Sequence, residues 1–196
     1  MPVRSTMAAL ISRVRLLIND PAGASQQFAD QDIQDVLDEA REDVRYVALA
    51  PAPTYSGSTI SYLDYYADLG SWEDDIVLKQ YRIITVTPSA SENIVGHWTF
   101  AVTTLPPVFA VGKLYDVYRG AADLLERLSA RYMLKYNVVA DGQNLQRSQM
   151  AMAIQQLART YRMQQRARTI QVTRSDLEAS ASQRGSLLQP VEIDYM

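Results

Sequence analysis

The sequence predicts a mainly α-helical fold, namely a four-helix bundle with a strand-rich insertion and an extended C-terminal arm. Apolar residues recur with the period of an amphipathic helix in four stretches, 6–19, 31–49, 113–136 and 146–167. Between the second and third stretches the residues change to Val, Ile, Thr, Tyr and Trp, which favour strands. The predicted parts are a helical bundle of 1–52 and 113–168, a β-rich insertion of 53–112, and an arm of 169–196.

The first two predicted helices each have clear start and stop signals. The first ends at Asn19-Asp20-Pro21, and the second begins after Asp30 as N-cap and ends before Pro51. The second carries a continuous acidic face opposite its apolar stripe, made of Asp32, Asp35, Asp38, Glu39, Glu42 and Asp43. This face is expected to be exposed.

Pro51-Ala52-Pro53 marks the clearest boundary and opens the insertion. Candidate strands are 58–66, 76–86, 93–103 and 108–112, with turn-forming residues between them. The chain has 12 Tyr against 3 Phe, and tyrosine is enriched at interfaces as well as in half-buried sheets. We therefore take Tyr62, Tyr65 and Tyr66 as candidate partner contacts, and Tyr81 has the same ambiguity.

In the third predicted helix, Gly120 indicates close packing by another backbone. Asp141-Gly142 is the predicted turn into the fourth helix. The fourth helix has a predicted core stripe, while Arg159, Arg162 and Arg166 lie on the opposite side. The members of that stripe are Met150, Ala153, Ile154, Leu157 and Tyr161. The arginine face fits a solvated surface, a protein contact or, more weakly because stacking aromatics are missing, a nucleic-acid contact.

Composition limits the chemistry. The chain has no Cys and one His, which excludes disulfides and thiolate metal sites and leaves little support for zinc. No stretch of 18 apolar residues is present, so no membrane span is expected, and the first residues lack the apolar core of a signal peptide. Glycines occur singly, without a phosphate-binding pattern.

Two weak catalytic hypotheses follow from single features. His97 lies in an alternating stretch and reads mainly as a strand residue beside Trp98, since a base would need a nucleophile and an orienting acid. The acidic stretch 64–75 reads mainly as a solvated turn, although a carboxylate metal site there would make the protein an enzyme. We expect neither enzymatic activity nor a cofactor.

Several blocks of sequence, in this order, resemble the head–tail connector (adaptor) proteins of long-tailed bacteriophages across about residues 6–168. The blocks are Leu10-Ile11-Ser12-Arg13-Val14-Arg15-Leu16-Leu17-Ile18-Asn19-Asp20, Phe28-Ala29-Asp30-Gln31-Asp32-Ile33, Tyr115-Asp116-Val117-Tyr118-Arg119-Gly120-Ala121-Ala122-Asp123-Leu124-Leu125, Asp141-Gly142, Arg147-Ser148-Gln149, Leu157-Ala158 and Tyr161-Arg162. The insertion is longer than in minimal members of that family.

The resemblance implies a non-enzymatic virion protein of the phage neck, assembled in the host cytoplasm as a homo-oligomeric ring, usually of twelve copies. Such a ring sits under the portal, receives a stopper or tail-completion protein, and lets genomic DNA pass through its lumen without sequence-specific binding. The arm of such proteins commonly grips the portal. Its candidate contact residues here are Leu187, Leu188, Val191, Ile193 and Tyr195.

The uneven distribution of charge suggests how copies would meet. Residues 1–112 hold 14 Asp and Glu against 7 Lys and Arg, whereas residues 147–196 hold 4 against 7. We expect the acidic face of one copy to meet the basic face of the next, which sets the register of a closed ring. The candidate contacts are Asp35, Glu39 and Glu42 with Arg159, Arg162 and Arg166. The alternative function is a DNA-binding ring of the packaging machinery, similar to a small terminase.

Overall fold

The computed structural model describes residues 2–134, 138–140, 143–145 and 147–166, and for 138–140, 143–145, 147 and 148 the backbone alone. It corrects the predicted fold class, because helices make up 38% and strands 30% of a mixed α/β chain. The helices are η1 (Ser5–Met7), α1 (Ala8–Ile18), α2 (Asp30–Glu39), α3 (Val117–Met133) and α4 (Arg147–Gln164). The strands of the two main sheets are β1 (Arg41–Ala48), β2 (Ala50–Ser56), β3 (Thr59–Tyr66), β4 (Val77–Gln80), β5 (Ile84–Val86), β6 (Ala90–Glu92), β7 (His97–Thr99) and β8 (Val108–Tyr115).

The predicted mainly α fold is wrong for one principal reason, the pairing of β1 with β8. The second helix was expected to run from 31 to 49, but it ends at Glu39, and the next residues form β1. The third was expected from 113, but 113–115 continue β8, and Arg41 pairs with Tyr115. Val44 and Val47 also fit the helical stripe, so local periodicity could not reveal a pairing between segments about 70 residues apart.

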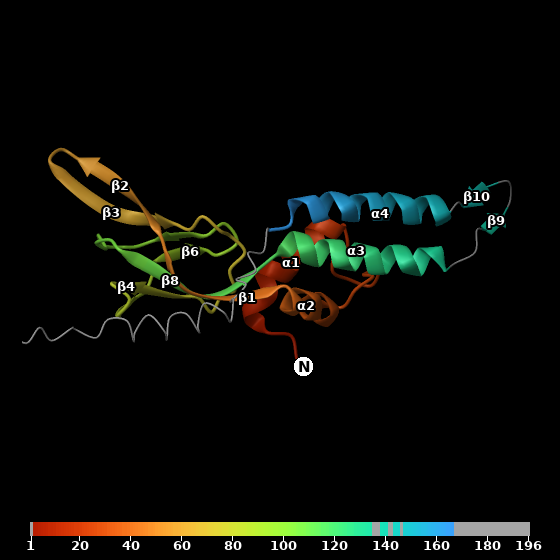
Figure 1. Ribbon diagram of the computed structural model, residues 1–196, viewed down its shortest axis with the longest axis horizontal. Coiled ribbons are helices and arrows are strands. Elements are labelled where there is room, and N and C mark those ends of the chain that lie inside the picture. The colour runs from red at the N-terminus through yellow and green to blue at the C-terminus, as the bar shows by residue number, and fades with distance from the viewer. Residues whose placement is uncertain (1, 135–137, 141–142, 146, 167–196) are drawn as a thin grey trace, which may run out of the picture. The chain divides into compact units, whose positions relative to one another are not determined.

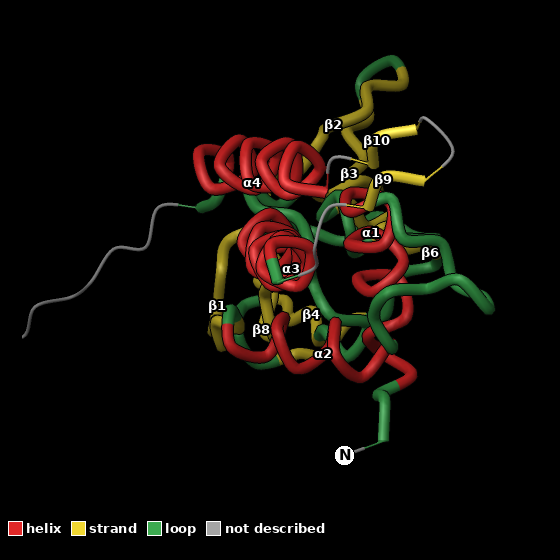
Figure 2. Tube along the Cα trace, turned by 90° about the vertical axis from the view of Figure 1, so that its right-hand side faces the viewer, coloured by secondary structure: helices red, strands yellow, loops and turns green. Residues whose placement is uncertain are grey.

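The four α-helices surround a common core. Figure 2 looks along α3 and shows α1, α2 and α4 around it. This core contains large buried side chains from α1, α2 and α3, whereas α4 contributes the small side chain of Ala158. Its fully buried members are Met7, Leu10, Val14, Ile33, Val36, Leu37, Tyr115, Ala121 and Leu124. Burying each of the larger side chains contributes roughly 1.5–3 kcal/mol, so this core supplies much of the stability.

The eight strands form two antiparallel four-stranded sheets (Figure 1). Sheet A has the order β1-β8-β4-β5, and sheet B the order β2-β3-β7-β6. A second core contains buried residues of both sheets, including Leu78 and Val108 of sheet A and Tyr65 and Trp98 of sheet B. The chain passes from sheet A to sheet B through the single buried residue Leu49, whose N–H donates to the Val108 carbonyl at 2.9 Å.

A buried polar junction joins the N-terminal segment to sheet A. The carboxylate of Glu73 is completely buried and accepts hydrogen bonds from Thr6 Oγ1 at 2.6 Å and Tyr115 Oη at 2.7 Å. Arg4 Nε lies 3.1 Å and Lys113 Nζ 3.4 Å from its oxygens. Burial alone would raise the pKa of Glu73, but these hydrogen bonds and cations outweigh it, and the pKa is lowered.

Arg4 extends the junction to α2. Its guanidinium forms two hydrogen bonds with Asp38, at 2.9 and 2.6 Å, and reaches Tyr115 Oη at 3.1 Å. These contacts raise the pKa of Arg4, with the Asp38 hydrogen bonds as the largest cause. One cation therefore connects the N-terminal segment, α2 and β8.

A strand pair that was not predicted precedes α4. β9 (Val138–Ala140) pairs antiparallel with β10 (Gln143–Leu145), where a simple turn was expected. One compact unit ends at Arg166. Within the described ranges, no helix has the length and apolar character needed to cross a membrane.

Candidate assembly surface

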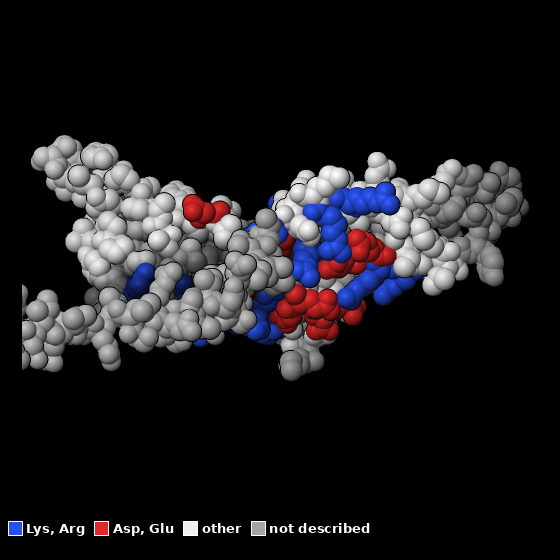
Figure 3. Space-filling model, viewed as in Figure 1, with Lys and Arg blue, Asp and Glu red and all other residues white. Residues whose placement is uncertain are grey.

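Charged side chains gather over α2, α3 and α4 on the face shown in Figure 3. Arg162 of α4 pairs with Asp123 and Glu126 of α3, and its Nη2 lies 3.0 Å from the Glu126 carboxylate. The pKa of Arg162 is raised, chiefly by its hydrogen bonds to Glu126. On the other side of α3, Arg127 lies 3.6 Å from Glu39 of α2. α3 therefore links the acidic and the basic helix within one chain.

This arrangement reduces the number of predicted residues that are available for a contact between copies. Glu42 lies on β1 and not on the second helix, because that helix ends at Glu39. Asp35 is exposed and accepts a hydrogen bond from Gln31 at 2.6 Å. Arg159 is exposed, and no hydrogen bond or ion pair joins it to the described part of the chain. Arg159 and Asp35 are therefore the best placed of the predicted residues for a contact in trans.

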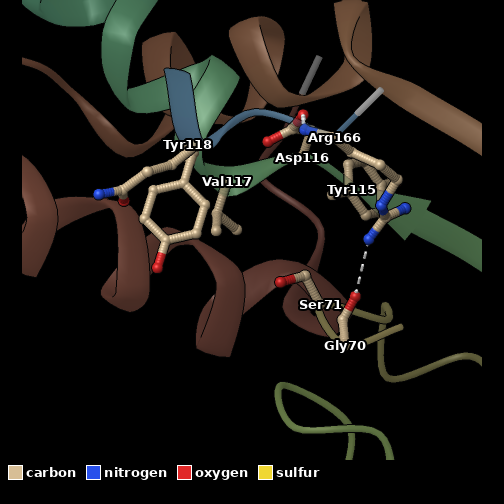
Figure 4. A pocket seen from close by; sticks show the side chains of 8 residues that line it. Gly70, Ser71, Tyr115, Asp116, Val117, Tyr118 and Arg166 are labelled. Atoms are coloured by element: carbon tan, nitrogen blue, oxygen red, sulfur yellow. Dashed lines mark hydrogen bonds between the residues drawn. The ribbon is translucent and has the colours of Figure 1, made fainter. Parts of the chain in front are cut away.

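Arg166 is used within its own chain, at a surface pocket of about 320 Å³. Its backbone N–H donates to Asp116 at 2.7 Å, and its guanidinium donates to the Gly70 carbonyl at 3.3 Å (Figure 4). Asp116 is also the N-cap of α3 and accepts from the Arg119 N–H. These contacts hold Arg166, which follows α4, against the start of α3 and against Gly70.

The fourth helix is rotated relative to its predicted stripe. Ala151 and Ala158 are buried, whereas Met150 and Leu157, which were expected in the core, are 45% and 40% exposed. Tyr161 stays partly buried and donates from Oη to the Leu17 carbonyl at 2.9 Å. Small alanines let α4 lie close to α3, and the Arg162 pairs favour this rotation. Met152 and Met163 are also exposed, but on another side of the helix, about 120–160° around its axis from Met150 and Leu157.

The three predicted interface tyrosines have different environments. Tyr65 is fully buried, donates from Oη to the Thr104 carbonyl, and has a pKa raised to about 12 by burial. It is therefore a core residue. Tyr62 is half-buried against the second core, and Tyr66 is 44% exposed. Of these three tyrosines, Tyr66 is the one that is exposed.

His97 lies on β7 beside Trp98, as predicted, and stacks on Tyr66 with ring centroids 4.4 Å apart. Its Nε2 is 3.0 Å from Asp64 Oδ1, and Thr99 Oγ1 donates to the same oxygen at 2.7 Å. The Thr99 and His97 hydrogen bonds lower the pKa of Asp64. Because the threonine hydroxyl donates to the carboxylate and lies 3.5 Å from the histidine, the three do not form a nucleophile–base–acid relay.

The acidic stretch 64–75 is distributed over separate contacts. Glu73 belongs to the buried junction, Asp75 pairs with Lys113, and Asp74 accepts from Asn93 Nδ2 at 2.9 Å. The described residues contain no group of three or more His, Asp or Glu side chains arranged to hold a metal ion. The metal-site hypothesis therefore has no geometric support in this stretch.

An aromatic and basic corner of sheet A was not predicted from the sequence. Arg82 lies over the rings of Tyr46 and Phe109, 5.6 and 5.0 Å from their centroids. Tyr46, Tyr81 and Arg82 all have positive φ, at 57°, 50° and 65°. The sequence contains one signal for this basic corner, because residues 76–91 include Lys79 and Arg82 but no Asp or Glu.

The predicted arm contacts, from Leu187 to Tyr195, lie outside the described residues.

In comparisons with protein-family models, with curated protein sequences and with solved structures, nothing matches this chain.

Proposed function

We propose that this protein is a structural ring subunit of the head–tail connector type. Copies associate side by side beneath a portal, receive a stopper or tail-completion protein, and surround the DNA channel in the phage neck. The proposal rests on the ordered sequence blocks that resemble this family, and the surface of α4 supports it.

One exposed face of α4 is the structural observation that supports the proposal. Met152 and Met163 expose 60% and 86% of their surface and share one face of the helix, because their spacing of eleven residues makes about three turns. Large exposed apolar side chains on one helix face are typical of a contact surface, and methionine adapts readily to a partner. Arg159 lies on the same helix without a partner in the described part of the chain.

A second copy is the occupant that fits this surface. The exposed face of α2 carries Asp32, Asp35 and Glu39, which complement Arg159 in charge. A contact between two different faces of one chain is heterologous, so repetition by rotation closes a ring. Exposed ion pairs contribute only about 0–1 kcal/mol each, so the charges set register while the apolar α4 residues supply affinity.

Arg159→Glu is expected to prevent ring formation while leaving the fold intact. The purified protein, alone and mixed with a portal ring, is examined by light scattering and negative-stain imaging. Adding Asp35→Lys to the same chain is expected to restore the ring, because the two charges are exchanged.

Arg162→Glu is the matched control on the same helix. It breaks the pairs with Asp123 and Glu126, so we expect a lower Tm in addition to any loss of assembly. The proposal fails if wild-type protein forms no ring with the portal, or if Arg159→Glu assembles like wild type. Tight duplex DNA binding with a steep salt dependence would instead support the packaging-ring alternative.

A further inference from the structure

The outer face of sheet A, opposite the second core, carries cationic side chains around an aromatic ring. Leu78 and Ala110 point into the second core, so the next residue of β4 and the preceding residue of β8, Lys79 and Phe109, point to the outer face. Lys79 is directly opposite Phe109 in the pairing of these two strands. The Arg82 guanidinium lies on the same face, 5.0 Å from the centroid of the Phe109 ring. Two cations therefore flank one ring.

A bulge in β1 adds a second ring and a third cation to this face. The pairing of β1 with β8 shifts by one residue at Arg45 and Tyr46. Tyr46 meets Phe109 edge to face, with ring centroids 6.5 Å apart, and Arg82 lies 5.6 Å from the Tyr46 centroid. Arg45, the preceding residue of the bulge, is exposed. The Arg82 guanidinium is therefore held against two rings from different strands.

The turn that carries Arg82 has a backbone conformation that its residues disfavour. The Ile83 N–H donates to the Gln80 carbonyl at 3.2 Å, and the residues between them, Tyr81 and Arg82, have φ of 50° and 65°. Turns with positive φ at both central residues favour Asn-Gly. Tyr46 also has positive φ, at 57°. Strained backbone of this kind clusters at functional sites, so its occurrence at three neighbouring aromatic and cationic residues indicates a role beyond folding.

The cations of this surface have no carboxylate to neutralise them. In the described part of the chain, no hydrogen bond or ion pair joins the side chains of Arg45, Lys79 and Arg82 to another group. Strands β4 and β5 and the turn between them contain no Asp or Glu. The acid just before β4, Asp75, is paired with Lys113. A polyanion can therefore bind here without displacing an internal ion pair.

The rings determine which polyanion fits this surface best. Tyr46 and Tyr81 expose 39% and 47% of their surface. The bases of a single strand stack on aromatic rings and on arginine side chains, while its phosphates pair with cations. In a duplex the bases are already stacked on one another, and an acidic polypeptide has no bases. Neither of these two partners would use the rings in this way.

We infer that the outer face of sheet A around Arg82 binds single-stranded nucleic acid. Arg45, Lys79 and Arg82 contact phosphates, and Tyr46 and Tyr81 stack on bases. The arginine is already held against two rings, so less side-chain freedom is lost when it binds a phosphate. The site lies on sheet A and does not depend on the ring contacts of α2 and α4.

Fluorescence anisotropy of the full-length chain with a labelled oligothymidine of about twelve nucleotides tests this site. Saturable binding is expected. Arg82→Gly should weaken it at least about tenfold, because one guanidinium contact to phosphate is lost. The slope of the logarithm of the binding constant against the logarithm of salt concentration should also become shallower, by about 0.7 for this one contact.

The variants are chosen so that the turn is kept. Glycine and asparagine adopt positive φ more readily than the residues they replace, so Arg82→Gly and Tyr81→Asn should not lower the Tm. Tyr81→Asn should weaken binding roughly fivefold or more, since the stacking of one base is lost. Arg13→Ala removes another exposed arginine, on α1, and should leave binding unchanged.

Competition separates the possible occupants. Poly-L-glutamate at equal charge should displace the labelled strand poorly, and a duplex of the same length should bind more weakly than the strand, because neither presents unstacked bases. Absence of saturable binding, equal binding of the duplex, or an equal loss with Arg13→Ala overturns the inference. Equal competition by poly-L-glutamate also overturns it and assigns the surface to an acidic polypeptide. Ile83 and Ile84, exposed by 82% and 54%, would then be its apolar contacts.

Discussion

Gly70→Ala is expected to destabilise the fold by about 2–4 kcal/mol, because the added methyl group has no space. A Cβ at Gly70 would lie 2.3 Å from the Ile94 carbonyl oxygen, and that oxygen belongs to the backbone. The same carbonyl accepts the Ser71 N–H at 2.9 Å, so relieving the clash also breaks this hydrogen bond. The loop at 70 would have to move away from residue 94.

Gly57→Ala provides the control for this prediction. Gly57 has a left-handed conformation, with φ of 60°, which Gly70 does not have, but nothing lies within 4 Å of a Cβ added at Gly57. Alanine there should cost about 1 kcal/mol from backbone strain alone. Urea unfolding of both variants measures the difference. Equal midpoints would show that segments 70 and 94 do not approach each other this closely.

Glu73→Gln is expected to cost about 1.5–3 kcal/mol, because charge-assisted hydrogen bonds at a buried carboxylate are lost. The side chain keeps its size, but Arg4 and Lys113 lose the carboxylate between them. Thr6 and Tyr115 donate to different carboxylate oxygens, and an amide nitrogen replaces one of these oxygens, so one of the two hydrogen bonds loses its acceptor. Asp75→Asn removes the other partner of Lys113 at an exposed position and should cost less than about 1 kcal/mol.

The pH dependence of unfolding gives a second measurement of Glu73. Its pKa is lower in the folded chain than its ordinary value of 4.5, so the folded state binds a proton less readily than the unfolded state. The stabilisation is therefore fully present above about pH 4.5 and is lost as the pH falls below it. The difference in unfolding free energy between wild type and Glu73→Gln should shrink from pH 7 to pH 3. A constant difference would contradict this role of the charge.

The sequence predicted the four α-helices and some of the strands, but not the fold class. The predicted strand at 58–66 is confirmed as β3, and the first and fourth helices lie close to their predicted ranges. β1 was predicted as part of a helix because its valines also fit a helical period. The pairing with β8 is what distinguishes a strand from a helix here. Gly120 does mark a close approach, but to a side chain and not to a backbone, since a Cβ at this position would lie 3.1 Å from Leu37 Cδ2.

The candidate surface was harder to predict than the fold. The arginine face of α4 was recognised, but its use within the chain depends on Asp123 and Glu126, whose orientation toward Arg162 requires the packing of α3 against α4. The exposed Met150 and Leu157 depend on the same rotation of α4, which the buried alanines permit. The corner at Arg82 depends on backbone conformations that no residue-type preference indicates.

Leu49 has a consequence for how the chain tolerates changes in length. Since one residue connects β1 to β2, inserting or deleting a single residue there would reverse which side chains of β2 point inward. Because only Leu49 separates the two strands, the inward or outward direction of each side chain in β2 depends on the directions in β1. Length variation should be accepted instead at the tip around Gly57, where an added residue changes no strand's phase.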